Sequence, residues 1–141
     1  MKKNILIIAF ICIGFLRTQA QEEETFDVTI EIVGITKNSG KIFLALYDNE
    51  ETFLKSNSKG TKASVENKKA TAQFKGLKKG EYAISIFHDE NDNNKLDTKI
   101  FGIPKEPYGF SNDATGFMGP PKFENAKFLV DSNKTIKIKV N

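Results

Sequence analysis

The sequence predicts an all-β fold, an antiparallel β-sandwich of about seven strands with one long ordered loop. Three observations support this prediction. Short segments alternate between apolar and polar side chains, turn residues separate these segments, and no segment has the pattern of a long helix or of a βαβ unit. A small β-barrel is the alternative architecture.

The alternation is clearest in the first predicted strand. Between residues 26 and 32, apolar side chains occupy every second position and polar ones the positions between them, which is typical of a half-buried strand. Residues 41–47 are apolar on both faces, so we expect them in the centre of a sheet. Further strands are expected at residues 62–65, 70–74, 81–88, 126–130 and 135–140. We expect the first two of these to pair with each other.

One short helix is expected after the second strand. Asp48 has the side chain of an N-cap and Glu51 follows three residues later, which is the pattern of a capping box. The pattern predicts a single capped helix over residues 48–54.

Residues 89–122 form a long exception to the strand pattern. They contain all 4 prolines of the chain, together with the aromatic residues Phe101, Tyr108, Phe110 and Phe117. Because disordered linkers are poor in aromatic residues, we expect an ordered loop with a short strand near residues 100–103. We expect the last three of these aromatics to pack onto the sandwich, and the lining of a ligand groove is the alternative.

The N-terminal segment has the pattern of a secretory signal peptide. Two lysines precede an apolar run from residue 5 to 16, and Ala20 supplies a small residue at the end. The run is too short to span a bilayer comfortably, since about 20 apolar residues are needed. We expect cleavage of residues 1–20, with an uncleaved signal anchor as the alternative. Residues 21–141 would then form a single exported domain, periplasmic or extracellular, without membrane insertion.

The net charge of +3 belongs to this N-terminal segment. Lys2, Lys3 and Arg17 are 3 of the 21 basic residues, so their removal leaves 18 lysines against 18 acidic residues. The remaining chain has no arginine, and its lysines are scattered among acidic residues. Because nucleic-acid binding requires a basic patch, we expect no nucleic-acid partner. The single cysteine, Cys12, also leaves with the segment, which suits an oxidising compartment.

The most specific chemical pattern is the loop of residues 89–97. Oxygen-bearing side chains stand at relative positions 1, 3, 5 and 9, which are Asp89, Asn91, Asn93 and Asp97. This spacing matches the first part of an EF-hand calcium loop, in which short oxygen side chains wrap a hard cation. Lys95 stands at position 7, which contributes a backbone carbonyl. Asn94 replaces the usual glycine of position 6 and tolerates a left-handed conformation. We therefore expect the loop to bind Ca²⁺.

The EF-hand pattern is incomplete after position 9. Ile100 stands where an EF-hand has a bidentate glutamate, and a strand rather than a helix leads into the loop. A calcium ion would need further oxygen ligands from outside the loop. Glu106 is a candidate for this role, as are Asp113 and Asn112. A solvated Asp/Asn turn without metal is the alternative.

No catalytic constellation stands out in the sequence. His88 is the only histidine, and we expect it to be structural and satisfied by a hydrogen bond. Ser85 on the same strand lacks the context of a nucleophile, and the carboxylates Glu90 and Glu106 are a weak acid–base pair. We expect a non-enzymatic protein that binds calcium and presents its long loop to a protein or glycan ligand. A hydrolase of extracellular polymers and a purely structural or carrier module without metal are the alternatives.

Two motifs resemble a family of exported bacterial proteins. The first runs from Leu77 through Gly80 and Tyr82 and continues into His-Asp-Glu-Asn at residues 88–91, and the second is FGIPKEPYGFSN at residues 101–112. Both resemble the domain of unknown function family numbered 2141, over nearly the whole exported chain. The resemblance implies a small exported β-sandwich, and it implies no catalytic or binding residues, because the family has none established. The Leu-x-x-Gly-x-Tyr turn is also similar to transthyretin-like sandwiches, which implies an Ig-like or prealbumin-like topology.

Overall fold

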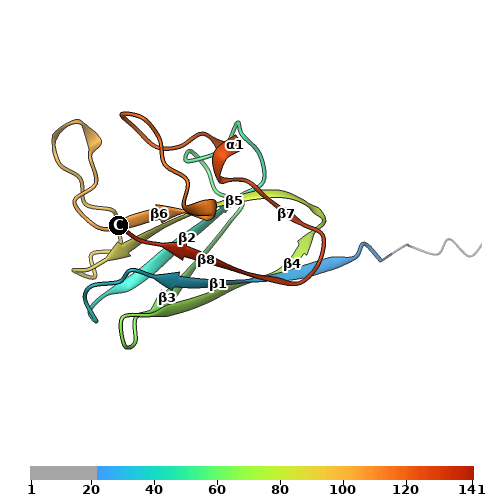
Figure 1. The fold of residues 1–141 in the computed structure, drawn as a ribbon, viewed down its shortest axis with the longest axis horizontal. Helices are drawn as coiled ribbons and strands as arrows, with labels where there is room; N and C mark the ends of the chain where they lie inside the picture. The colour runs from blue at the N-terminus through green and yellow to red at the C-terminus, as the bar shows by residue number, and fades with distance from the viewer. Residues whose placement is uncertain (1–21) are drawn as a thin grey trace, which may run out of the picture.

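Two β-sheets form the fold of residues 22–141 (Figure 1), which are the residues that the computed structural model describes. The expected signal peptide at residues 1–20 lies outside them. The strands are β1 Thr25–Val33, β2 Lys41–Tyr47, β3 Lys59–Ser64, β4 Ala70–Lys78, β5 Gly80–Asp89, β6 Tyr108–Phe110, β7 Phe128–Val130 and β8 Lys134–Lys139. Short helical segments are η1 Ile100–Gly102, η2 Ser111–Asp113 and α1 Phe123–Ala126. No helix within this part of the chain is long and apolar enough to cross a membrane.

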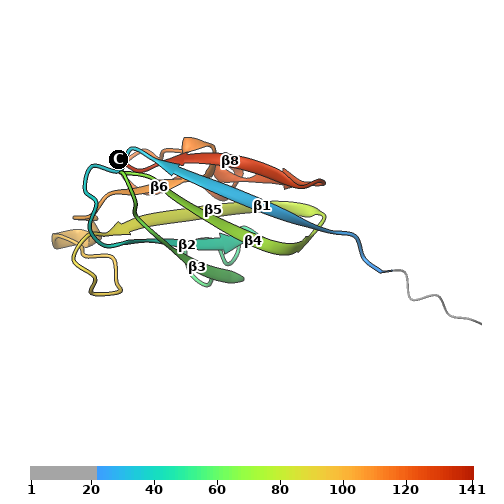
Figure 2. The same cartoon turned by 90° about the horizontal axis from the view of Figure 1, so that it is seen from below.

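The two sheets cover each other and enclose one main core (Figure 2). One sheet has three strands in the order β4-β1-β8. The other has five, in the order β3-β2-β5-β6, with β7 also paired to β5. The predicted all-β fold is confirmed, with eight strands among the described residues instead of about seven.

Alternating side chains explain how the strands build this core. Ile30 and Ile32 of β1 are 0% and 1% exposed, and they belong to the same apolar cluster as Ile84 of β5. β2 lies between β3 and β5, as expected for a strand that is apolar on both faces. Ile42 and Leu46 of β2 face the core, so Phe43 and Ala45 face the opposite side of the sheet.

The expected antiparallel pairing is found for every pair of strands in the described sheets except β1 with β8. These two strands are parallel, with Val28 opposite Lys134 and Ile32 opposite Ile138. β7 pairs with β5 in the five-stranded sheet, so the chain crosses between sheets at residues 131–133 before it forms β8. Because a crossover rather than a hairpin delivers β8, no local turn sets its direction.

The expected pairing of residues 62–65 with residues 70–74 is wrong. β3 pairs with β2 in one sheet and β4 pairs with β1 in the other, and the connection keeps only an isolated bridge between Glu66 and Lys69. Ala63 of β3 and Phe74 of β4 are both buried in the main core. The two strands separate because they cover that core from opposite sides.

Two other local predictions also fail, both at residues with a positive φ. Instead of the helix expected at residues 48–54, the chain makes consecutive turns, and Leu54 has a φ of 59°. Asn49, not Asp48, is the capping residue, because its Oδ1 accepts the N–H of Thr52 at 2.9 Å. The strand expected near residues 100–103 is replaced by η1, where Phe101 has a φ of 64° that a strand cannot accommodate.

Candidate functional site

The loop of residues 89–97 leaves the end of β5, and its first residue folds it back on itself. Asp89 is 0% exposed, and its carboxylate oxygens accept the backbone N–H groups of Asn93 at 3.1 Å and Asn94 at 2.8 Å. Asn94 has a φ of 62°, the left-handed conformation expected at position 6. Asp89 therefore fixes the turn on which the other candidate ligands stand.

The side chains at positions 3, 5 and 9 of the loop meet at Asp97. Asn91 Nδ2 donates to Asp97 Oδ2 at 2.7 Å, and Asn93 Nδ2 donates to both oxygens of Asp97 at 3.0 Å. These hydrogen bonds, first that of Asn91 and then that of Asn93, hold the pKa of the Asp97 carboxyl below its usual value. The amide oxygens are also engaged, because Asn91 Oδ1 accepts the N–H of Asn93 and Asn93 Oδ1 accepts the N–H of Lys95.

Glu106 closes the neck of the loop. It is 7% exposed, and its carboxylate accepts the backbone N–H groups of Glu90 and Asp97, each at 3.0 Å. The side chain thus holds the two ends of the loop together. Sequence reasoning named Glu106 as a source of metal oxygens and missed this structural contact.

The other two outside candidates bond elsewhere. Asp113 Oδ1 accepts the backbone N–H of Lys139 at 2.9 Å, next to the end of the chain. Asn112 Nδ2 donates to the backbone oxygen of Lys127 at 2.7 Å. Both side chains hold C-terminal segments in place and are bonded away from the loop.

The donor set of the loop combines amides with carboxylates. Within residues 22–141, no three His, Cys, Asp or Glu side chains come together as a metal-binding group. A cation in the loop would therefore depend on asparagine oxygens, which calcium accepts as ligands. The Nδ2 groups of Asn91 and Asn93 face Asp97. Both side-chain amides must therefore flip before their oxygens can coordinate the same ion as the Asp97 carboxylate.

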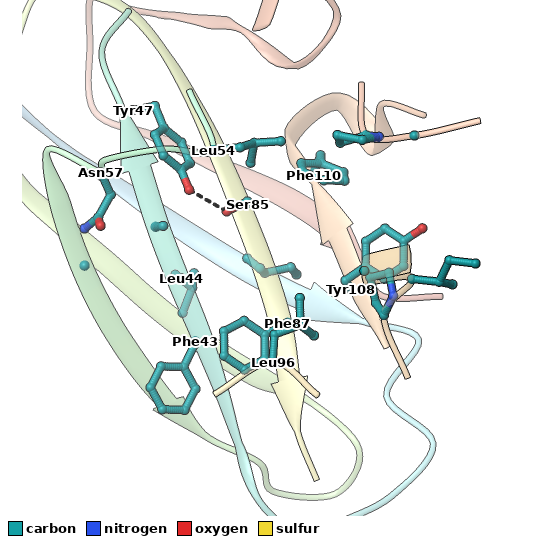
Figure 3. A pocket seen from close by; sticks show the side chains of 18 of the residues that line it. Phe43, Leu44, Tyr47, Leu54, Asn57, Ser85, Phe87, Leu96, Tyr108 and Phe110 are labelled. Atoms are coloured by element: carbon teal, nitrogen blue, oxygen red, sulfur yellow. Dashed lines mark hydrogen bonds between the residues drawn. The ribbon is translucent and has the colours of Figure 1, made fainter. Parts of the chain in front are cut away.

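The five-stranded sheet carries an open groove of about 950 Å³ on the face opposite the core (Figure 3). Phe43 and Phe87 lie on its floor as stacked rings whose centroids are 4.9 Å apart, and Tyr47 lies further along β2. Residues 89–122 form a long excursion after β5, and this excursion lines the groove through Leu96 and through residues 101–104 and 118–120.

The sequence contains a signal for this groove, because residues 41–47 are apolar on both faces. That pattern predicts a central strand, and β2 does lie between β3 and β5. However, no long helix covers the outer face of its sheet among the described residues, so Phe43 and Ala45 remain half-buried beneath a groove. Phe87 became part of the floor because the β2–β5 register places it directly opposite Phe43.

Residues 30–138, which include both motifs quoted above, match the family model described as uncharacterized protein conserved in bacteria, DUF2141. The chain belongs to the DUF2141 family. No curated protein matches it. The family description names no activity, so the functional interpretation depends on the residues of this chain.

In this DUF2141 chain, His88 is buried and hydrogen-bonded. Its side chain is 0% exposed, and Nε2 lies 2.7 Å from the carbonyl oxygen of Ser39, so Nε2 carries the proton. Nδ1 has no hydrogen-bond partner within the described part of the chain and lies 3.9 Å from Glu90 Oε1. Ser85 is on the opposite face of β5, where its Oγ lies 3.2 Å from the Tyr47 hydroxyl in the groove (Figure 3).

The aromatic side chains of the excursion divide between two environments. Phe110 is 7% exposed and packs with Phe53 in a small second cluster, which confirms the expected packing for this residue. Tyr108 is 40% exposed, and both it and Phe110 line the groove, which was the alternative use. The packing expected for Phe117 is wrong, because its side chain is 94% exposed.

Proposed function

We propose that the protein is an exported, non-enzymatic binding protein whose loop of residues 89–97 binds Ca²⁺. The observation that supports this proposal is the convergence of Asn91, Asn93 and Asp97, on a turn that the buried Asp89 closes. Calcium takes six to eight oxygen ligands, so the Lys95 carbonyl and water molecules would complete a shell built from these four side chains.

Calcium would act by holding the excursion that follows the loop. Residues 98–104 form a narrow bend, in which Lys99 N donates to Ile103 O at 2.6 Å. The bend returns to the loop, because Lys105 N donates to Asp97 O at 2.8 Å. An ion bound by Asp97 therefore restrains both ends of a segment that lines the groove, and this ordered surface is what we propose is presented to a protein or glycan ligand.

Thermal melting of the purified protein in millimolar calcium and in excess EDTA tests the metal site. A ligand that binds the native state stabilises it by about 2.7 kcal/mol at a free concentration of about 100 times Kd, so we expect a higher Tm in calcium. Asp97→Asn should abolish the shift. Asp92→Asn is the matched control, because this exposed carboxylate stands at a position that supplies no ligand and pairs with Lys41. An unchanged Tm up to millimolar calcium rules out the site.

Limited proteolysis tests whether the ion holds the excursion. Lys99 and Lys105 are exposed on either side of the bend, so trypsin reports on its opening. We expect calcium to slow cleavage at both lysines in the wild-type protein and not in Asp97→Asn. A rise in Tm without such protection would support the metal site and contradict its proposed effect on the excursion.

A carrier or structural module without metal is the second candidate. It is supported by the amide groups of Asn91 and Asn93, whose bonds already satisfy the Asp97 carboxylate. In that case the Tm is the same in calcium and EDTA, and Asp97→Asn lowers it equally in both. A hydrolase has less support, because the His88 side chain is 0% exposed and lies on the opposite face of β5 from Ser85.

A further inference from the structure

The groove on the outer face of the five-stranded sheet has the size and the lining of a small-molecule site. Its volume of about 950 Å³ lies within the range of about 300–1,000 Å³ that is usual for ligand pockets. The floor and walls are mostly apolar, with Phe43, Phe87, Leu54, Leu96, Ile103 and Phe110 among the lining residues. Few polar side chains interrupt this surface, so it favours an apolar molecule or the apolar part of one.

Two residues of the excursion expose apolar side chains to water at the edge of the groove. Phe101 is 96% exposed and Met118 is 93% exposed, although both line the groove. They also have φ values of 64° and 53°, a conformation that bulky residues rarely adopt. Contact with an apolar ligand would remove both side chains from water, which gives the ligand additional binding free energy.

A single cation stands beside the apolar floor. Among the described residues that line the groove, Lys62 is the only charged one. It lies directly opposite Phe43 in the β2–β3 register, with its Nζ 4.6 Å from the centroid of the Phe43 ring. Nζ is also 3.4 Å from Asn94 Oδ1, and within residues 22–141 it has no carboxylate partner. An apolar floor that ends at an unpaired ammonium group is complementary to a molecule with an apolar chain and one anionic head.

We propose that the groove binds a long-chain carboxylate. The carboxylate pairs with Lys62, and the hydrocarbon chain lies on Phe43 and Phe87 and extends along β2 towards Tyr47. Phe43 and Tyr47 are four residues apart, about 13 Å along the strand, which accommodates an extended alkyl chain. Phe101 and Met118 cover the chain from the side of the excursion. The site depends on the groove and does not require calcium.

Isothermal titration calorimetry with monomeric dodecanoate tests the proposal. We expect saturable one-to-one binding, with dodecyltrimethylammonium bound at least about tenfold more weakly, because it presents a cation to Lys62. Lys62→Glu should weaken dodecanoate binding by at least about tenfold. Lys79→Glu, at an exposed lysine in the turn between β4 and β5, is the matched control and should leave binding unchanged.

A second pair of variants tests the apolar part of the site. Ala45→Trp on the floor should fill the groove and abolish dodecanoate binding. Phe101→Ser removes an almost fully exposed side chain, so it should weaken binding with no change in Tm. This variant keeps the test decisive if Ala45→Trp fails to fold.

Six results would overturn the proposal. Three concern the variants: unchanged affinity of Lys62→Glu, full binding by a folded Ala45→Trp variant, and unchanged affinity of Phe101→Ser. Three concern the ligand: no saturable binding of dodecanoate, equal affinity for the cationic amphiphile, and binding of phosphatidylglycerol vesicles without binding of dodecanoate. The last result would identify a membrane surface as the ligand. Titrations in calcium and in EDTA separate this proposal from the calcium site, because a calcium-induced rise in Tm without dodecanoate binding contradicts only the carboxylate site, and the reverse result contradicts only the metal site.

Discussion

Asp97 shows how the loop satisfies its own charges. Its carboxylate accepts hydrogen bonds from two asparagine side chains, and its backbone N–H donates a hydrogen bond to Glu106. Carboxylates at the asparagine positions would repel Asp97, whereas amides donate hydrogen bonds to it. The combination of Asp and Asn at these positions therefore keeps several oxygen atoms close together at a low electrostatic cost.

The lowered pKa of Asp97 predicts a contribution to stability that is lost in acid. The ionised form stabilises the fold above the unfolded-state pKa of about 3.9, and this contribution disappears as the pH falls through the lower pKa of the folded state. In EDTA, we expect the Tm difference between wild type and Asp97→Asn to be constant near neutral pH and to shrink below about pH 4. A difference that persists unchanged at the lowest pH would contradict this assignment.

The sequence could predict the part of the candidate site that lies within one short segment of the chain. Asp89, Asn91, Asn93 and Asp97 stand within one short segment, so their spacing alone indicated a common turn. The contact of Glu106 with Glu90 joins residues 16 positions apart, and no local pattern reports it. The groove was even harder to predict from the sequence, because its floor depends on the strand register that places Phe43 opposite Phe87.

At the scale of elements, the alternation of side chains located strands and did not choose their partners. Residues 62–65 and 70–74 have the pattern of a hairpin, yet β3 and β4 belong to different sheets. A pattern with a period of two reports which face of a strand is buried. The pattern does not report which strand lies beside a given strand, because the two sheets that enclose the core bury the same kinds of side chains.

β6 is the element that connects the excursion to the sandwich. It pairs with β5 on one side, and on the other its Tyr108 exchanges backbone hydrogen bonds with Asn141 at 3.1 and 3.3 Å. Gly109 permits this close approach, because a Cβ atom there would lie 2.2 Å from the carbonyl oxygen of Lys139. The position of β6 thus depends on the absence of one side chain.

Gly109→Ala should therefore destabilise the protein. The added methyl group forces the backbone of β6 away from the chain end, and overpacking of this kind costs about 1–3 kcal/mol. Urea denaturation followed by circular dichroism measures the change in free energy of unfolding. Gly119→Ala is the control in the same excursion, because a Cβ atom there meets nothing within 4 Å. Equal destabilisation by both substitutions would contradict a specific clash at β6.

At the scale of the whole molecule, the proposed export signal and the folded domain are separate along the chain. β1 begins at Thr25, so cleavage after Ala20 leaves the first strand complete. N-terminal sequencing of the protein recovered from the periplasm or medium should give Gln21 as the first residue. Ala20→Leu, which places a large side chain at the cleavage site, should slow this processing. Recovery of an intact Met1 form in the membrane fraction would instead indicate an uncleaved anchor.

The parallel ladder between β1 and β8 also has a consequence for the order of folding. It joins the first strand to the last, and contacts so distant in sequence form late because closing the intervening chain costs entropy. Until residues 134–139 are available, β1 has β4 as its sole neighbour in the three-stranded sheet. A chain that crosses a membrane with its N-terminus first would therefore complete this sheet only after its last strand has crossed.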